Sequence, residues 1–333
     1  MQRQGTSHMK AALCKSLNGP ESLIIETLPD PEVGAGQVLL RVEAVGLNFA
    51  DTLVTRGTYQ FKPELPFSPG AEIAGVVERA PLGAGISAGA RVMAYINWGG
   101  AAEKIAVGVD KLIPLPDSVP MTVAAGLSVT YGTAIHGLKD RGRLKAGETV
   151  VVTGAAGGAG QAAVEIAKLM GAHVIAVASS AEKCAIAEAA GADETILFPG
   201  SDLKATVRDR TGGKGADVVY DCIGGAASEP LIRALAWQGR FLVVGFAAGE
   251  IPKIPLNLVL LRGAELAGVF WGEAVRRDPA GHRANMLEVL EWVADGRLKP
   301  RIHATYPLDR IGDALRVIEQ RKATGKIVLT VPN

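Results

Sequence analysis

The chain has 333 residues, 48% of them hydrophobic, which is enough apolar material for two domain cores. Its 35 Lys and Arg balance 34 Asp and Glu without long runs of one charge, so neither nucleic acid nor a membrane surface is favoured as a partner. No apolar stretch approaches the ~20 residues that span a bilayer, and the three cysteines are scattered, as free thiols are. We therefore expect a soluble, cytoplasmic protein that acts on a small molecule.

Residues 1–8 have the character of a cloning scar. The start MQRQGTSHM lacks the apolar core of a signal peptide, and its Ser-His-Met ending is typical of an expression vector. The sequence therefore predicts a natural start at Met9 and no functional role for His8.

The segment from residue 9 to 129 is predicted to be a β-rich domain. Its short runs of Val, Ile and Leu are separated by clusters of Gly and Pro, which is the pattern of strands joined by turns. The expected strands are 22–27, 37–45, 73–79, 91–96 and 101–107.

From residue 130 to 271 the pattern changes to strands that alternate with amphipathic helices, which predicts a doubly wound parallel sheet. The expected strands are 149–153, 173–178, 194–197, 218–220 and 240–245, and the expected helices are 161–170, 181–190, 202–211 and 230–236. Residues 272–333 hold two further helices, 284–294 and 311–320, and a closing strand at 326–331. This tail is too short to fold alone, so we expect it to complete the first domain.

A turn of small residues follows the first strand of the second domain. The strand 149–153 leads into Gly154-Ala-Ala-Gly157-Gly-Ala-Gly160, where glycines allow a pyrophosphate to approach the backbone at a helix N-terminus. The dinucleotide pattern G-x-G-x-x-G is met with Ala155 at its first position, and such a turn also suits ordinary strand-to-helix packing. Because the next strand ends about twenty residues later, where a ribose-binding residue is expected, the context favours dinucleotide binding.

The residues at that ribose position favour NADPH over NADH. An NAD-specific site carries Asp or Glu there, whereas this chain has Ser179, Ser180 and Lys183. Hydroxyls and a cation suit a 2′-phosphate. The alternative is that Lys183 only solvates the next helix.

No metal site is predicted. The five histidines stand apart from one another and from the cysteines, and none has metal-ligand spacing. The G-x-S-x-G motif of a hydrolase nucleophile is also absent from the sequence.

Several segments together resemble a known family. The runs 46–51 (GLNFAD), 56–59 (RGTY), 66–75 (PFSPGAEIAG), 155–160 and 324–329 (TGKIVL) look like the quinone oxidoreductase (ζ-crystallin-like) branch of the medium-chain dehydrogenase/reductase superfamily. The resemblance covers the chain from Met9 onward and implies an α/β protein, with a Rossmann sheet at 130–271 and a GroES-like catalytic domain from 9–129 and 272–333. Zinc-dependent relatives place a cysteine near Asn48, a histidine before Glu72 and a four-cysteine loop after residue 95. These ligands are missing here, so the resemblance implies a zinc-free member.

The resemblance also assigns roles to individual residues. The phosphate turn falls on Ala156, Gly157, Gly158 and Ala159, and the 2′-phosphate contacts fall on Ser180 and Lys183 beside Ser179. A tyrosine that often assists at this phosphate is replaced by Phe198, which removes a donor. The residues on the nicotinamide side are Asn48, Thr130, Phe246, Phe270 and Trp271, and Tyr59 lines the substrate cleft.

Asn48 and Tyr59 are the candidate catalytic residues, as hydrogen-bond donors to the acceptor oxygen on which negative charge develops. The alternatives are a turn-forming Asn and an aromatic that merely lines the surface. The leading function is NADPH-dependent reduction of quinones or activated enones, with an enoyl-thioester (enoyl-CoA) reductase second. A non-catalytic dinucleotide-binding protein with a structural or RNA-associated role is third. Residues 264–269 are a β-prone stretch expected at the sheet edge, which predicts a homodimer joined there. The alternative is that Pro252 and Pro255 cap this edge and leave a monomer.

Overall fold

The computed structural model describes residues 7–332, which divide into two compact units. The first unit contains the chain up to Val129 and from Met286 onward, and the second contains Thr130–Asn285. The chain was predicted to return to the first unit at residue 272, whereas in the structure it returns at Met286. Trp271 is buried, and its ring meets that of His282 edge-on at 5.4 Å between centroids, so this segment packs within the second unit.

The predicted cloning scar lies mostly in residues 1–6, outside the described part of the chain. His8, for which no role was expected, is the first residue of strand β1 and pairs with Pro29.

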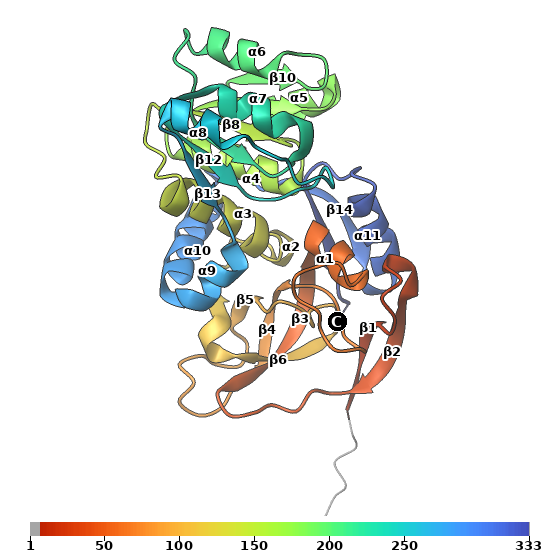
Figure 1. Ribbon diagram of the computed structural model, residues 1–333. Helices are drawn as coiled ribbons and strands as arrows, with labels where there is room; N and C mark the ends of the chain where they lie inside the picture. Colours follow the sequence, from red (N-terminus) through yellow and green to blue (C-terminus); the bar gives the residue numbers. More distant parts are fainter. Residues whose placement is uncertain (1–6, 333) are drawn as a thin grey trace, which may run out of the picture. The chain divides into compact units, whose positions relative to one another are not determined.

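The first unit is built on a sheet with strand order β14-β15-β3-β4-β5-β7, to which β6 adds by pairing with β3 (Figure 1). A separate ribbon pairs β1 with β2. The strands are β1 His8–Cys14, β2 Leu23–Pro29, β3 Gln37–Leu47, β4 Glu72–Arg79, β5 Arg91–Tyr95, β6 Lys104–Gly108, β7 Leu112–Pro114, β14 Ile302–Pro307 and β15 Lys326–Thr330. The helical segments are η1 Pro20–Ser22, α1 Phe49–Thr55, η2 Val109–Lys111, α2 Met121–Ala124, η5 Leu308–Arg310 and α11 Ile311–Glu319.

Strand β3 is central because it pairs with β15, β4 and β6. Its apolar residues Val38, Leu40 and Val42 are buried in a cluster that also receives Ile311 and Leu315 from α11. The tail of the chain therefore completes this core, because the apolar face of a sheet must be covered by another element.

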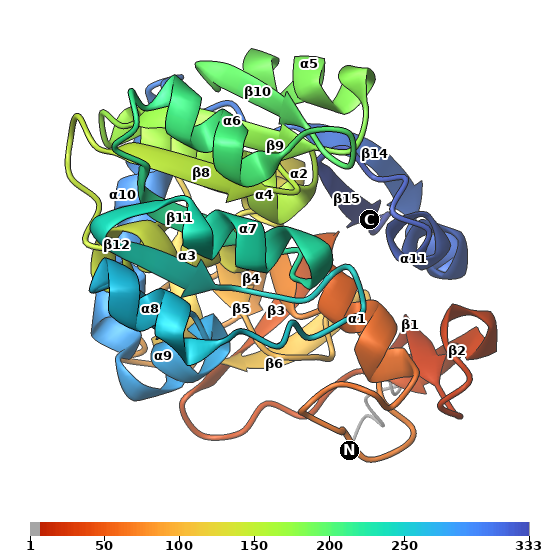
Figure 2. The same cartoon turned by 45° about the horizontal axis from the view of Figure 1, so that its top comes forward.

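The second unit contains a parallel sheet with the order β10-β9-β8-β11-β12-β13, which is the order of a doubly wound dinucleotide-binding fold. In Figure 2, α6, α7 and α8 lie in front of the strands. The strands are β8 Thr149–Thr153, β9 His173–Ala178, β10 Glu194–Leu197, β11 Ala216–Asp221, β12 Leu235–Val243 and β13 Glu265–Gly268. The helical segments are α3 Ser128–Ile135, η3 His136–Arg141, α4 Gly158–Leu169, α5 Ala181–Ala189, α6 Leu203–Arg210, η4 Gly225–Ala227, α7 Ser228–Arg233, α8 Leu256–Arg262, α9 Trp271–Arg277 and, running on into the first unit, α10 Pro279–Ala294.

Strand β12 begins earlier than the sequence predicted, at Leu235 instead of residue 240. Leu235 and Ala236 are buried, and Leu235 pairs with Ala216 across an irregularity in the register with β11. These residues were expected to end a helix, but α7 stops at Arg233.

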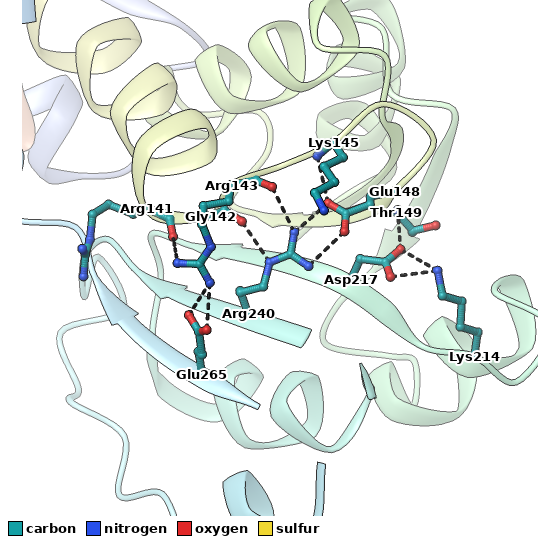
Figure 3. A network of polar contacts seen from close by, with 10 residues as sticks. All are labelled: Arg141, Gly142, Arg143, Lys145, Glu148, Thr149, Lys214, Asp217, Arg240 and Glu265. Atoms are coloured by element: carbon teal, nitrogen blue, oxygen red, sulfur yellow. Dashed lines mark hydrogen bonds and ion pairs between the residues drawn. The ribbon is translucent and has the colours of Figure 1, made fainter. Parts of the chain in front are cut away.

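Ion pairs hold the sheet at the end where its strands begin (Figure 3). Arg240 of β12 contacts Glu148 at 2.6 Å, and Asp217 of β11 accepts hydrogen bonds from the Thr149 amide and from Lys214. With this end closed by side chains, the carboxyl ends of the strands form the edge at which a ligand of such a sheet binds. Among residues 7–332, no helix is long and apolar enough to cross a membrane.

Candidate cofactor and acceptor sites

The turn between β8 and α4 is shaped for a close backbone approach. A Cβ atom at Gly160 would lie 2.2 Å from the Gly154 carbonyl oxygen, so the start of the helix packs on the turn only with glycine there. Gly157 is the N-cap residue of α4 and has no side chain to cap the helix. The first amides of α4, which follow the buried Ala156 at Gly158 and Ala159, are therefore positioned to bind an anion.

The three residues predicted to contact a 2′-phosphate lie together after β9. Ser180 is the N-cap of α5, and its Oγ accepts a hydrogen bond from the Lys183 amide at 3.2 Å. The Lys183 ammonium donates to Ser179 Oγ at 3.3 Å. Two hydroxyls, a cation and a helix N-terminus thus meet on the strand next to the phosphate turn, which is a suitable arrangement for a phosphate.

The predicted aromatic residues differ in exposure. Phe198 follows β10 and packs partly buried against the core of the sheet. Phe246 after β12 is 38% exposed and Phe270 after β13 is 50% exposed, so both side chains reach the surface. Trp271 is only 6% exposed, and its ring packs against that of His282. Thr130 is also 6% exposed. Phe246 and Phe270 are therefore better placed than Trp271 for direct contact.

Asn48 lies in a buried polar cluster of the first unit. The register of β15 and β4 on β3 brings Lys326 and Glu72 beside it. The Lys326 ammonium contacts Glu72 Oε1 at 2.5 Å and Asn48 Oδ1 at 2.8 Å, and Asn48 Nδ2 donates to Glu72 Oε1 at 2.9 Å. The two charged groups fix the orientation of the Asn48 amide, which keeps one further N–H to donate.

Asp51 ties this cluster to the neighbouring loop. Its carboxylate accepts the Asn48 amide at 2.8 Å and the Gly70 amide at 3.0 Å. Burial raises the pKa of Asp51 to about 6, although these hydrogen bonds oppose the shift. Asp51, Glu72 and Lys326 lie in the segments that carry the family resemblance, but no role was predicted for them from the sequence.

Tyr59 is half-buried on the segment after α1, and its ring lies 6.0 Å from that of Phe61. Burial, followed by the nearby Asp51 charge, raises the pKa of Tyr59. Tyr95, on β5, has a raised pKa for the same reasons together with Tyr59. Tyr59 is therefore a neutral phenol at physiological pH, able to donate a hydrogen bond.

Comparison with known proteins identifies the family. Residues 34–117 match the alcohol dehydrogenase GroES-like domain family, and residues 158–294 match the zinc-binding dehydrogenase family. A quinone oxidoreductase-like protein 2 homolog of Nematostella vectensis is 40% identical over 98% of this chain and 90% of its own length. The chain belongs to the quinone oxidoreductase branch of the medium-chain dehydrogenase/reductase superfamily. It is thus an oxidoreductase, and the predicted GroES-like and Rossmann folds are confirmed.

Solved structures from this superfamily match along the whole chain. A probable oxidoreductase from Mycobacterium abscessus is 40% identical with a TM-score of 0.89, covering 98% of this chain and 100% of that one. A quinone oxidoreductase from Thermus thermophilus, solved also in complex with NADPH, is 36% identical with a TM-score of 0.82, covering 96% and 99%.

The cluster around Asn48 includes the positions near which the resemblance expects the cysteine and the histidine of zinc-dependent relatives. Here Asn48 accepts a hydrogen bond from Lys326, and Ala71 precedes Glu72. The Lys326 ammonium lies 2.5 Å from the Glu72 carboxylate and supplies the positive charge that this buried carboxylate would otherwise attract from a metal ion. In the described part of the chain, no three His, Cys, Asp or Glu side chains are grouped to hold a metal ion.

Proposed function

We propose that this chain is a zinc-independent, NADPH-dependent reductase of quinones or of the activated double bond of enones. The observation that carries the proposal is the group of Ser179, Ser180 and Lys183 beside the glycine turn, because these residues offer hydroxyls and a cation where an NADH-specific enzyme has a carboxylate. When bound, NADPH supplies a hydride, and a proton from solvent completes the two-electron reduction.

The chain's own residues would orient the reactants and stabilise charge. The α4 amides and the turn hold the pyrophosphate, and Phe246 and Phe270 offer exposed faces to the nicotinamide side. Asn48 and Tyr59 donate hydrogen bonds to the acceptor oxygen as negative charge develops on it. Lys326 and Glu72 keep the Asn48 amide in the donating orientation.

The test is NADPH consumption across a panel of quinones, short enones and enoyl-thioesters. The proposal expects turnover of quinones or enones, and Asn48→Ala and Tyr59→Phe should lower kcat more than NADPH affinity. If enoyl-thioesters are reduced preferentially, the protein is the second candidate, an enoyl-thioester reductase, and the proposed quinone or enone substrate is wrong. NADPH binding without turnover of any member, or binding of RNA in a gel-shift assay, would contradict the reductase.

We expect no stoichiometric zinc in the active protein. The Asn48, Glu72 and Lys326 side chains already satisfy one another, and Lys326 would repel a second cation. Elemental analysis of protein purified without added metal measures the content. One zinc per chain, lost together with activity on chelation, would contradict this expectation.

The proposal includes a homodimer joined through β13. This strand ends the sheet order, and Leu266 on it is 40% exposed. Helix α8, Leu256–Arg262, precedes this strand, and its residues Leu256, Leu260 and Leu261 are 70–78% exposed. Pro255 is the N-cap residue of this helix. An unpaired strand edge together with exposed leucines favours association with a second copy.

Leu260→Lys and Leu266→Lys should shift the dimer toward the single-chain mass of 34.6 kDa in light scattering at micromolar concentration. Val269, just after β13, is only 6% exposed, so a lysine there would disrupt the core instead. Leu82→Lys is the matched control, because Leu82 is fully exposed in the first unit. A wild-type protein of single-chain mass would exclude the dimer.

A further inference from the structure

A buried carboxylate lies at the carboxyl end of β11. Asp221 is 3% exposed, and its Oδ1 accepts hydrogen bonds from Thr153 Oγ1 at 2.6 Å and from the Ile223 and Gly224 amides at 3.1 Å. Its Oδ2 accepts one from Ser228 Oγ at 2.7 Å. Four donors thus satisfy the carboxylate, which is the arrangement that holds an ionised acid in a buried place.

The charge of Asp221 is not neutralised by a cation. Within residues 7–332, no Lys, Arg or His side chain forms an ion pair with it. Asp217 on the same strand differs, because its carboxylate is paired with the Lys214 ammonium at 2.8 Å (Figure 3). Hydrogen bonds from neutral groups leave the net charge of Asp221 in place, and a buried charge is screened less than one in water.

Asp221 also stands at the point where the sheet changes direction. Strands β8 and β11 are adjacent and parallel, and from β8 the chain proceeds through α4 to β9 on one side, while β11 leads to β12 on the other. The crevice at such a switch point is where dinucleotides bind. The Thr153–Asp221 hydrogen bond joins the ends of β8 and β11 at this point, and the Cys222 thiol donates to the Thr153 carbonyl at 3.1 Å.

We propose that Asp221, which joins the ends of β8 and β11, is a positioning residue for the cofactor, and that its unpaired charge favours the oxidised cofactor over the reduced one. The inference rests on the proposed function. NADP⁺ differs from NADPH by a positive charge on the nicotinamide ring, so a nearby anion stabilises only the oxidised form. With an effective dielectric constant of ~20, one unit charge would change the affinity by roughly tenfold if it lay ~10 Å from the ring.

The experiment compares dissociation constants of NADP⁺ and NADPH for the intact wild-type protein and Asp221→Asn, each measured by titration calorimetry. Asparagine has nearly the same shape and removes only the charge. We expect the affinity for NADP⁺, relative to that for NADPH, to fall by about three- to tenfold. Equal weakening of both forms would reduce Asp221 to a structural role and overturn the proposal. Asp221→Ser, smaller and also neutral, must give the same shift if the asparagine variant does not fold.

Two control variants separate charge from structure. Ser228→Ala removes one donor and keeps the carboxylate, so both forms should weaken equally. Asp217→Asn removes a buried carboxylate from the other end of β11, about 13 Å away at the usual rise per residue, and should leave the ratio unchanged. A ratio shifted as strongly by either control would contradict the proposal. A wild-type protein that binds neither NADP⁺ nor NADPH would instead contradict the proposed function.

Discussion

NADPH should bind this chain at least ten times more tightly than NADH. The 2′-phosphate, which NADH lacks, would meet the Lys183 ammonium and the hydroxyls of Ser179 and Ser180 after β9. A charge-assisted hydrogen bond to phosphate contributes ~1.5–3 kcal/mol, which corresponds to roughly ten- to hundredfold in affinity. Because Phe198 replaces a tyrosine expected to assist at this phosphate, we expect the lower part of this range. Calorimetric titration of the protein with each cofactor measures the two dissociation constants.

Lys183→Ala should reduce the difference in affinity between the two cofactors, because it weakens the binding of NADPH and leaves the binding of NADH nearly unchanged. Lys204→Ala is the matched control, since Lys204 is an exposed lysine of the next helix and lies after the neighbouring strand β10. High salt should weaken NADPH more than NADH, because the contact is ionic. Equal affinities for the two cofactors in the wild-type protein would refute the preference.

The cofactor-binding half could be predicted because its signals are local. The strand 149–153, the glycine turn and Ser179 to Lys183 form one contiguous strand-helix-strand segment, so their spacing along the chain fixes their proximity in space. Asp221 was not predicted, although its place at the end of the buried strand β11 resembles that of Thr153 at the end of β8. A polar residue that ends a buried parallel strand is a readable signal for this edge of the sheet.

The acceptor half could be predicted only in part, because its contacts are distant in sequence. Asn48 bonds Glu72 across 24 residues and Lys326 across 278, and only the register of β3 with β4 and β15 brings the three together. The return of the chain to the first unit was misplaced for a related reason. The contact of Trp271 with His282, which holds α9 in the second unit, is a packing detail without a sequence pattern.

Lys326→Met should lower the free energy of unfolding by about 3–5 kcal/mol, because it leaves the buried Glu72 carboxylate without its cation. Lys326 is 3% exposed and Glu72 is fully buried, so water cannot replace the ammonium. Methionine has a similar length and stays apolar, which limits the change to the lost charge and its hydrogen bonds to Leu47 and Asn48. Urea unfolding followed by circular dichroism gives the free energy, provided that the transition is two-state.

Adding Glu72→Gln to Lys326→Met should recover part of this loss, because residue 72 then carries no unpaired buried charge. The recovery is limited, since the Val129 amide and Asn48 still need the acceptors that Glu72 provides. Lys15→Met is the control: its ion pair with Glu26 is partly exposed, with side-chain exposures of 48% and 35%, so its loss should cost at most ~1 kcal/mol. If Lys326→Met costs no more than Lys15→Met, the carboxylate of Glu72 is not held by its lysine, and the fixed orientation of the Asn48 amide must have another cause.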